Sequence, residues 1–281
     1  TTLLQSSAAS DVYKRQVSGY QNKGWWSPIK VLRPDEVAQC REGLENYEAS
    51  VGHPIEFPEK SKSYLLFEWA DYLVHHPKVL DAVEAVIGPD ILVYHSTTWI
   101  KEAQTPAFVH WHQDGTYFFL EPHLHVTAWV ALSDCPPESG CVRVISGSHK
   151  LGQFKHNDDP GQWNMIKRGQ GIFDQFDDEA GVLMPLRAGE MSLHHTDVVH
   201  SSAGNDTDYR RVGIGISYIP TSVCPVGEPT PSALLVRGKD NYGNFIQEQR
   251  LGVQQSPEAI AAHNEANTRF RARQDLGANI T

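Results

Sequence analysis

Cysteine is scarce in this sequence, and its placement excludes two kinds of structure. The four cysteines, at positions 40, 135, 141 and 224, form no CxxC pair, so we expect neither a disulfide framework nor a thiolate zinc site. Lysine and arginine form no run, and the formal net charge is −10, which argues against nucleic acid or an anionic membrane as a partner. No apolar run reaches the length of a membrane span and no secretory signal is present, so we predict a cytoplasmic protein.

The overall composition is typical of one folded domain. Apolar residues make up 40% and charged residues 21% of the 281 positions, and no change in composition divides the chain. Only the first residues stand apart, because residues 11–16 resemble the translation of a transposon-type sequencing adapter. We therefore predict that residues 1–16 are a non-native tag from fragmentary metagenomic DNA and that the native N-terminus is missing. Residues 17–281 would form a single domain.

Helical and strand patterns follow one another along the chain without alternating. Proline and acidic residues open the first helical pattern and Gly52 stops it. Helices are predicted over residues 34–51, 65–74, 77–87 and 256–274. Strands are predicted over residues 91–100, 108–114, 123–133, 141–146, 190–195 and 211–219. Helices followed by a run of strands predict a mainly β (α+β) fold, a sheet sandwich or barrel buttressed by helices.

A histidine and a carboxylate stand two residues apart at His112 and Asp114. On a strand, such side chains project from the same face, so a neutral nitrogen and an anionic oxygen can meet at one point. This pair suits a divalent metal, and a second histidine would complete a two-histidine, one-carboxylate face with open positions opposite. The candidates for that histidine are His194, His195 and His200.

The motifs, taken in order, resemble the phytanoyl-CoA dioxygenase family of non-haem Fe(II)- and 2-oxoglutarate-dependent oxygenases. The resemblance runs from about residue 89 to residue 220, and it is carried by the ordered set of motifs and not by any one of them. Ser146 departs from the family, which has proline there. The matching segments are His112-Gln113-Asp114, the strand with Trp129, residues 140–149, residues 200–205 and Arg210-Arg211.

The resemblance implies a fold and a set of metal ligands. The fold would be a double-stranded β-helix, a cupin-like jelly roll, over about residues 89–220. A helical buttress would precede it over about residues 30–88, and an extension with a helix would follow over residues 221–281. Residues 152–188 are polar, glycine-rich and long, which predicts a lid or binding loop. The iron ligands would be His112, Asp114 and His200, with His110 as the alternative in a shifted register.

The resemblance also implies a site for 2-oxoglutarate. Arg211, or Arg210 if the register differs by one residue, would pair with the distal carboxylate, because a guanidinium and a carboxylate form a bidentate pair. If Arg211 faces inward, period-2 alternation turns Gly213 and Gly215 inward as well and leaves room for the cosubstrate. The other residues expected near 2-oxoglutarate are Trp129, Thr97, Thr127 and His95.

A protein of this kind uses Fe(II), 2-oxoglutarate and O2 to hydroxylate an unactivated C–H, and it releases succinate and CO2. Asp114 bears on the outcome, because related halogenases have a small residue in place of this carboxylate, so its presence predicts hydroxylation. We expect a small-molecule substrate that is anionic or polar, such as a phosphonate, a carboxylate or a secondary-metabolite intermediate. Its candidate contacts are Tyr117, Phe119, His125, Arg168 and Gln170.

Three other functions fit parts of the pattern. An acyl-CoA hydroxylase of the same family would need basic residues for the CoA diphosphate, and the sequence has no basic cluster. A cupin-like metal enzyme could use the same ligands without 2-oxoglutarate, but Arg211 beside inward glycines argues against it. A non-catalytic binding protein of the jelly-roll type would show no dependence on iron.

Overall fold

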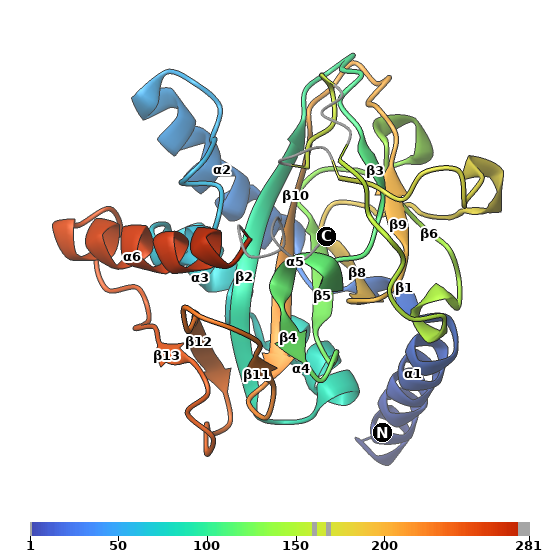
Figure 1. Ribbon diagram of the computed structural model, residues 1–281, viewed down its shortest axis with the longest axis horizontal. Helices are drawn as coiled ribbons and strands as arrows, with labels where there is room; N and C mark the ends of the chain where they lie inside the picture. Colours follow the sequence, from blue (N-terminus) through green and yellow to red (C-terminus); the bar gives the residue numbers. More distant parts are fainter. Residues whose placement is uncertain (1, 159–161, 167–169, 275–281) are drawn as a thin grey trace.

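Two β-sheets face each other at the centre of the molecule (Figure 1). The computed structural model describes residues 2–158, 162–166 and 170–274. The strands of the larger sheet are, in order, β1 (Trp25–Lys30), β8 (Glu190–His195), β5 (Val126–Ala131), β10 (Arg211–Pro220), β2 (Ile91–Lys101), β12 (Ser232–Arg237) and β13 (Ile246–Gln247). Those of the smaller sheet are β3 (Val109–His112), β9 (His200–Ser202), β6 (Val142–Val144) and β7 (Val182–Met184). A short ribbon joins β11 (Cys224–Pro225) to β4 (Leu120–Glu121).

The two sheets enclose one interior. Their strands pair antiparallel, apart from the parallel pair β12 and β13 at one edge. Trp129 and Ala131 of the larger sheet lie in one buried cluster with Val142 and Val144 of the smaller sheet. This jelly roll confirms the predicted mainly β fold with flanking helices.

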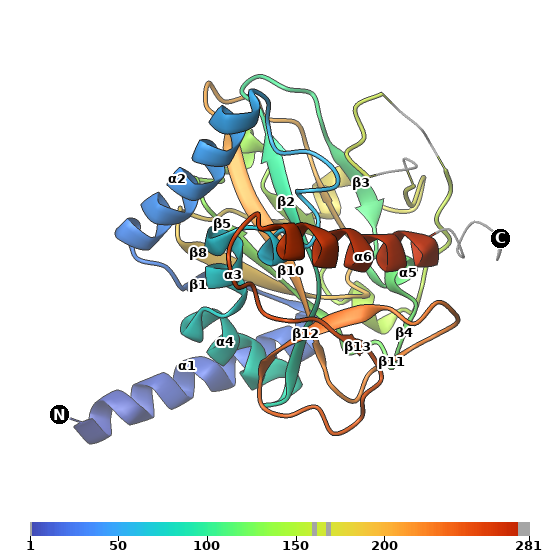
Figure 2. The same ribbon diagram turned by 90° about the vertical axis from the view of Figure 1, so that its left-hand side faces the viewer.

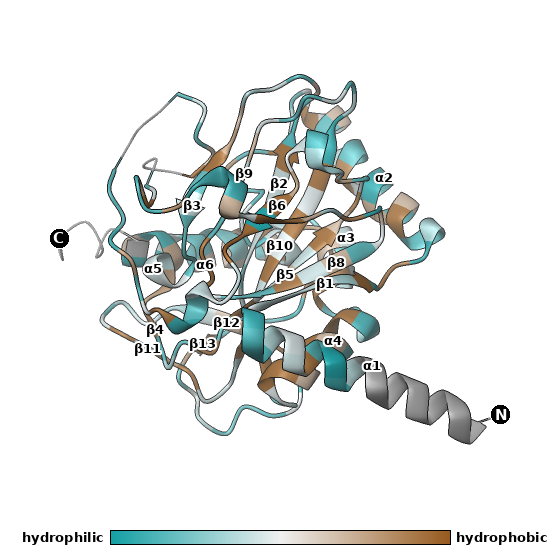
Figure 3. Cartoon of the chain, turned by 90° about the vertical axis from the view of Figure 1, so that its right-hand side faces the viewer, coloured by the Kyte–Doolittle hydropathy of each residue, from teal (hydrophilic) through white to brown (hydrophobic). Residues whose placement is uncertain are grey.

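Strand β10 shows how the sequence pattern sets the two faces of the larger sheet. Val212, Ile214 and Ile216 are buried in the cluster that also contains the apolar residues of the helices, as period-2 alternation predicts. The opposite face carries Arg211 and Gly213 into the space between the sheets. Figure 3 shows the resulting hydrophobic (brown) and pale bands along the strands of this sheet.

Helices α2 (Pro34–Val51), α3 (Glu68–Val74) and α4 (Pro77–Ile87) cover the outer face of the larger sheet (Figure 2). The predicted stop of α2 is confirmed, because Gly52 adopts a left-handed φ of 77° and its N–H donates to Glu48 O. The helix predicted over residues 65–74 is shorter than expected, since a 3-10 turn, η1 (Ser63–Leu65), precedes it. Helix α6 (Pro257–Gln274) lies against η1, α5 (Gly115–Phe118) and β12, and its Phe270 stacks on His95 of β2. None of the described helices is both long and apolar enough to cross a bilayer.

A further helix, α1 (Thr2–Lys23), has no counterpart among the predicted elements. It packs on α4, where the Gln16 Nε2 donates to Ala82 O at 2.7 Å, and Tyr20 is buried one turn further on. The helix continues across residue 16, where we predict that a tag ends. The non-native origin of residues 1–16 stays a prediction.

Candidate metal centre

His112, Asp114 and His200 come together at one point between the sheets. Their ligand atoms all lie within 4.8 Å of one another. His112 ends β3 and is paired in register with His200 at the start of β9, which sets their ring centroids 4.0 Å apart. Backbone pairing thus brings together two histidines that are far apart in the sequence.

Asp114 reaches this point by a different route from the one predicted. Strand β3 ends at His112, and Asp114 has helical φ and ψ of −59° and −37° at the start of the short helix α5 (Gly115–Phe118). The prediction that strand alternation aligns Asp114 with His112 is therefore wrong. A tight turn does so instead, and it points the carboxylate back toward the two imidazoles.

The ring orientation of both histidines suits metal binding. The Nδ1 of His112 lies 2.8 Å from His110 O and that of His200 lies 3.0 Å from Val198 O. A carbonyl oxygen only accepts, so each Nδ1 carries the proton and each Nε2 keeps its lone pair. These Nε2 atoms lie 3.6 and 3.7 Å from the Asp114 Oδ1. Two neutral nitrogens and one carboxylate oxygen thus face a common centre, and this donor set fits a divalent metal with open positions.

His110 does not join this cluster. Its side chain lies between the rings of Phe108 and Phe173, with centroids 4.7 and 4.8 Å away, and its backbone carbonyl orients His112. The shifted register with His110 as a ligand is therefore wrong.

Burial and neighbouring imidazoles act in opposite directions on the Asp114 carboxyl. Burial raises its pKa, but the surrounding histidines, His200 first among them, outweigh burial and hold the pKa of Asp114 well below its usual range. Burial also holds the pKa of His200 well below its usual value. An ionised carboxylate and a neutral imidazole are the forms that bind a metal.

The triad opens into a cavity of about 70 Å³ that also contains the predicted cosubstrate arginine. Arg211 is 2% exposed, and its NH1 donates to Gly140 O at 2.6 Å. Its guanidinium lies 5.3 Å from the centroid of the Trp129 ring. No carboxylate within the described residues forms an ion pair with it. The other residues that line the cavity are Trp99, Val109, Thr127, Val142, His194, Ser201 and Ser202.

Arg210, the alternative by one residue of register, lies outside this cavity. Its guanidinium binds both carboxylate oxygens of Glu48 at 2.6 and 2.7 Å and Glu102 at 2.9 Å. Its charge is therefore already paired.

The inward glycines of β10 make room for tryptophan rings. A Cβ on Gly213 would lie 2.3 Å from carbon atoms of the Trp129 ring, and one on Gly215 would lie 3.3 Å from the Trp99 Nε1. The expected alternation is confirmed, but the space at Gly213 is filled by the indole and is not left free for a cosubstrate. The glycine acts through Trp129, which in turn contacts Arg211.

The other residues predicted near 2-oxoglutarate divide into two groups. Thr127 and Trp129 line the cavity, and the Thr127 Oγ1 donates to the Asp114 Oδ2 at 2.8 Å. His95 and Thr97 are not among its lining residues. The His95 ring stacks on Phe270 with centroids 3.9 Å apart, and its Nε2 lies 3.0 Å from the Thr97 Oγ1.

The predicted substrate contacts do not form one group. The Tyr117 ring lies 6.2 Å from that of His112, whereas the Phe119 carbonyl accepts from Arg273 at the opposite end of α5. His125 is 2% exposed, and Thr127 and Thr196 already occupy its ring nitrogens. Gln170 donates to Asp158 at an exposed position. Arg168 lies outside the described residues.

Gln113, between the two predicted ligands, has a structural role that the sequence alone does not predict. The buried Gln113 Nε2 donates to Gly152 O and Asp197 O at 2.9 and 2.8 Å, and its Oε1 accepts from Phe154 N at 2.8 Å. Its backbone N–H donates to the His156 Nε2 at 3.0 Å. The residue between two predicted ligands thus fastens the start of the long loop to the metal centre.

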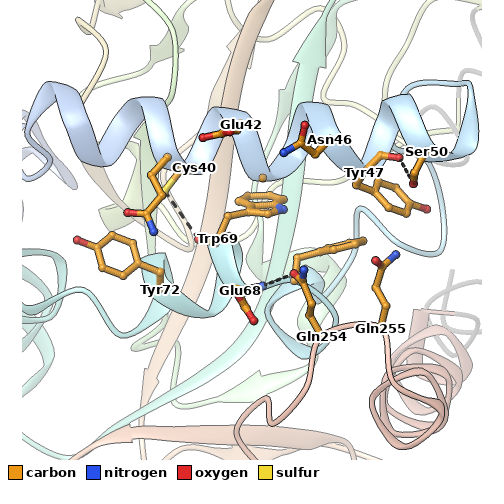
Figure 4. A pocket seen from close by; sticks show the side chains of 13 residues that line it. Cys40, Glu42, Asn46, Tyr47, Ser50, Glu68, Trp69, Tyr72, Gln254 and Gln255 are labelled. Atoms are coloured by element: carbon orange, nitrogen blue, oxygen red, sulfur yellow. Dashed lines mark hydrogen bonds between the residues drawn. The ribbon is translucent and has the colours of Figure 1, made fainter.

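A second pocket, of about 330 Å³, lies on the helical side of the larger sheet, between α2, α3 and residues 254–255 (Figure 4). Its walls include the aromatic side chains of Tyr47, Phe67, Trp69 and Tyr72. The lining contains no lysine, arginine or histidine. It therefore offers neither a metal cluster nor a cation for a dicarboxylate, and the chemistry lies at the smaller cavity.

Known proteins resemble this chain in both sequence and fold. The phytanoyl-CoA dioxygenase (PhyH) family profile matches residues 20–213, so the chain belongs to this family. A probable alpha-ketoglutarate-dependent hypophosphite dioxygenase of Stutzerimonas stutzeri is 24% identical over 255 residues, which cover 83% of this chain and 84% of that protein. Peroxisomal phytanoyl-CoA dioxygenase of Homo sapiens is 30% identical over 152 residues, 50% of this chain and 43% of that protein.

A solved structure extends the likeness to nearly the whole chain. The non-heme monooxygenase ThoJ, in its apo form, has a TM-score of 0.84 and is 31% identical, with 95% of this chain and 100% of that chain covered. The protein described here is accordingly a 2-oxoglutarate-dependent dioxygenase of the PhyH family, and its cofactors are Fe(II), 2-oxoglutarate and O2. The expected family, enzyme class and cofactors are confirmed.

Proposed function

We propose that this protein hydroxylates an unactivated C–H of a small, anionic or polar metabolite. The observation that carries the proposal is one cavity lined by both the triad and Arg211. Fe(II), 2-oxoglutarate and O2 supply an oxidant for C–H bonds there, with release of succinate and CO2. A metal site and a buried cation within one cavity suit a bidentate keto acid with a distal carboxylate.

The residues would divide the work between holding the metal and orienting the cosubstrate. His112, Asp114 and His200 would hold Fe(II), since a set of two histidines and one carboxylate can leave coordination positions for other ligands. Arg211 pairs with the distal carboxylate of 2-oxoglutarate, with its guanidinium kept in place by Gly140 O and by the Trp129 ring. His112, His200, Arg211 and Trp129 are buried and Asp114 is partly buried, which keeps most bulk water away from the reacting atoms.

Asp114 supports hydroxylation as the reaction, and a relative supports a small anion as the substrate. A carboxylate at this position favours hydroxylation over halogenation, because it fills the position that a halide would need. The relative from Stutzerimonas stutzeri is named for hypophosphite, which is a small anion. The human relative is named for an acyl-CoA, so an acyl-CoA hydroxylase is the alternative substrate class.

Anaerobic addition of Fe(II) and then 2-oxoglutarate tests the site. In halide-free buffer, we expect a visible charge-transfer absorption in the wild type and a much weaker one in Asp114→Ala, because the metal loses its anionic ligand and no halide replaces it. Asp208→Ala, at an exposed aspartate, should behave as the wild type. Iron binding without any response to 2-oxoglutarate would instead favour the cupin-like alternative.

Substrate class is tested by O2-dependent release of succinate over a library of small phosphonates, carboxylates and acyl-CoA thioesters. Stimulation by small anions above the uncoupled background is the expected result. Stimulation by acyl-CoA thioesters alone would reject the small-metabolite part of the proposal and leave the iron site intact.

A further inference from the structure

The two oxygens of Asp114 have different surroundings. Oδ1 faces the Nε2 atoms of His112 and His200 at 3.6 and 3.7 Å. Oδ2 points the other way and accepts a hydrogen bond from the Thr127 Oγ1 at 2.8 Å. The His194 Nε2 is also near Oδ2, but at 3.5 Å it lies beyond the usual length of a hydrogen bond.

Thr127 is the last member of a chain of hydrogen bonds whose direction is determined. A carboxylate only accepts, so the single hydroxyl proton of Thr127 points to Asp114. The Thr127 Oγ1 must then accept from the His125 Nε2, which lies 3.0 Å away. With its proton on Nε2, His125 accepts at Nδ1 from the Thr196 Oγ1 at 2.8 Å.

The chain requires a neutral His125, since a doubly protonated ring has no acceptor for Thr196. The ring is 2% exposed, and burial lowers the pKa of His125 to about 3. Thr196 therefore donates to His125, His125 donates to Thr127, and Thr127 donates to Asp114. Such a chain fixes both the tautomer of the imidazole and the rotamer of the threonine.

The chain of hydrogen bonds is attached to the larger sheet. Thr127 lies within β5, paired on one side with His194 of β8 and on the other with Ser217 of β10. The Thr196 N–H donates to His125 O at 3.1 Å, which ties the first two members together through the backbone. Asp114 is on the turn between β3 and α5, so the central strands of the larger sheet orient a carboxylate that the smaller sheet carries.

We propose that Thr196, His125 and Thr127 act as positioning residues that hold Asp114 so that only its Oδ1 binds the metal. The inference rests on the proposed role of Asp114 as a metal ligand. A carboxylate free to rotate could bind through both oxygens and occupy one more coordination position. Retaining Oδ2 on Thr127 keeps that position open for the keto acid or O2.

Binding of Co(II) alone to the apo protein tests the inference without turnover. Thr127→Val removes the hydroxyl and keeps the shape, and we expect a 10–100-fold weaker Co(II) affinity with an altered ligand-field spectrum. Thr127→Ser keeps the hydroxyl and should restore both. Thr98→Val is the matched control, because Thr98 is buried in the same sheet and its hydroxyl has no hydrogen-bond partner among the described residues.

The far end of the chain provides a second test. Thr196→Val lies outside the cavity lining and should weaken Co(II) binding less than Thr127→Val does, because Thr127 can still donate to Asp114. Wild-type Co(II) affinity and spectrum in a folded Thr127→Val would overturn the inference, as would an equal loss in Thr98→Val. If Thr127→Val does not fold, wild-type affinity and spectrum in Thr196→Val would overturn it. Unchanged Co(II) binding by Asp114→Ala would instead reject the proposed metal site itself.

Discussion

Charge is arranged differently inside the jelly roll and on its outer surface. Arg210 and Arg211 are neighbours in the sequence, yet Arg210 binds Glu48 and Glu102 at the surface. Arg211 points inward, is 2% exposed and has a single backbone acceptor at NH1. Burial lowers the pKa of Arg211, while the Glu48 carboxylate raises that of Arg210.

The ion pairs of Arg210 stabilise the fold, whereas the buried charge of Arg211 is suited to binding an anionic ligand. A buried cation without a carboxylate costs several kcal/mol of desolvation, so its retention calls for an anion that the described residues do not supply. Arg211 is the first residue of β10 and points inward, whereas Arg210 immediately precedes the strand and points outward, as the alternation of side chains along a strand predicts. The contrast predicts that the two arginines have opposite effects on stability and on binding.

Replacing each arginine by leucine should give the largest difference between the two variants, in both 2-oxoglutarate affinity and stability. Arg211→Leu should weaken 2-oxoglutarate binding by about 2–5 kcal/mol, because it removes one partner of a buried charge pair, while the apo protein keeps or gains stability. Arg210→Leu should leave that affinity unchanged and lower the free energy of unfolding by about 1 kcal/mol. Isothermal titration with 2-oxoglutarate and thermal unfolding measure the two effects. Equal losses of 2-oxoglutarate affinity in both variants would contradict the assignment of a binding role to Arg211 and a structural role to Arg210.

A smaller effect is expected where the inner face of β10 approaches Trp129. Gly213→Ala places a Cβ 2.3 Å from the indole ring, so the ring must move, at a cost of about 1–3 kcal/mol of stability. Because that ring contacts the Arg211 guanidinium, the affinity for 2-oxoglutarate should fall as well. Thermal unfolding and titration check both.

Gly215→Ala is the matched control, on the same strand and face. Its Cβ would lie 3.3 Å from the Trp99 Nε1, so a shift of a few tenths of an ångström accommodates it. We expect a smaller loss of stability and no change in 2-oxoglutarate affinity. A larger effect at Gly215 than at Gly213 would contradict the packing argument.

Patterns that depend on local physics could be predicted from the sequence. The bounds of α2 followed from proline at its start and Gly52 at its end, and both are observed. The two faces of β10 followed from period-2 alternation. The metal cluster followed from the ordered resemblance to a family, since His112 and His200 meet only through the pairing of β3 with β9.

Features that depend on tertiary contact could not be predicted. Strand β9 covers three residues, too few to show any period. In α1, the described buried side chains include a glutamine, Gln16, so the apolar pattern is weak. The turn at Asp114 and the indole that fills the gap at Gly213 both depend on segments distant in the sequence.

The smallest expected effect concerns a charge pair at the edge of the site. The His123 Nδ1 lies 2.9 Å from the Asp197 Oδ1, and the hydrogen bond to Asp197 raises the pKa of His123. Its stabilising contribution is therefore complete below the unfolded value of about 6.5 and is lost as the pH rises through the folded pKa. The melting temperature of His123→Gln should fall below that of the wild type by about 1–2 °C at pH 5.5, and by less at pH 8.5.

Both proteins are measured with chelator, so that metal binding does not contribute to the melting temperature. His53→Gln, whose nearest carboxylate oxygen is 3.7 Å away at an exposed position, should show a smaller difference, and a pH-independent gap for His123→Gln would refute the assignment.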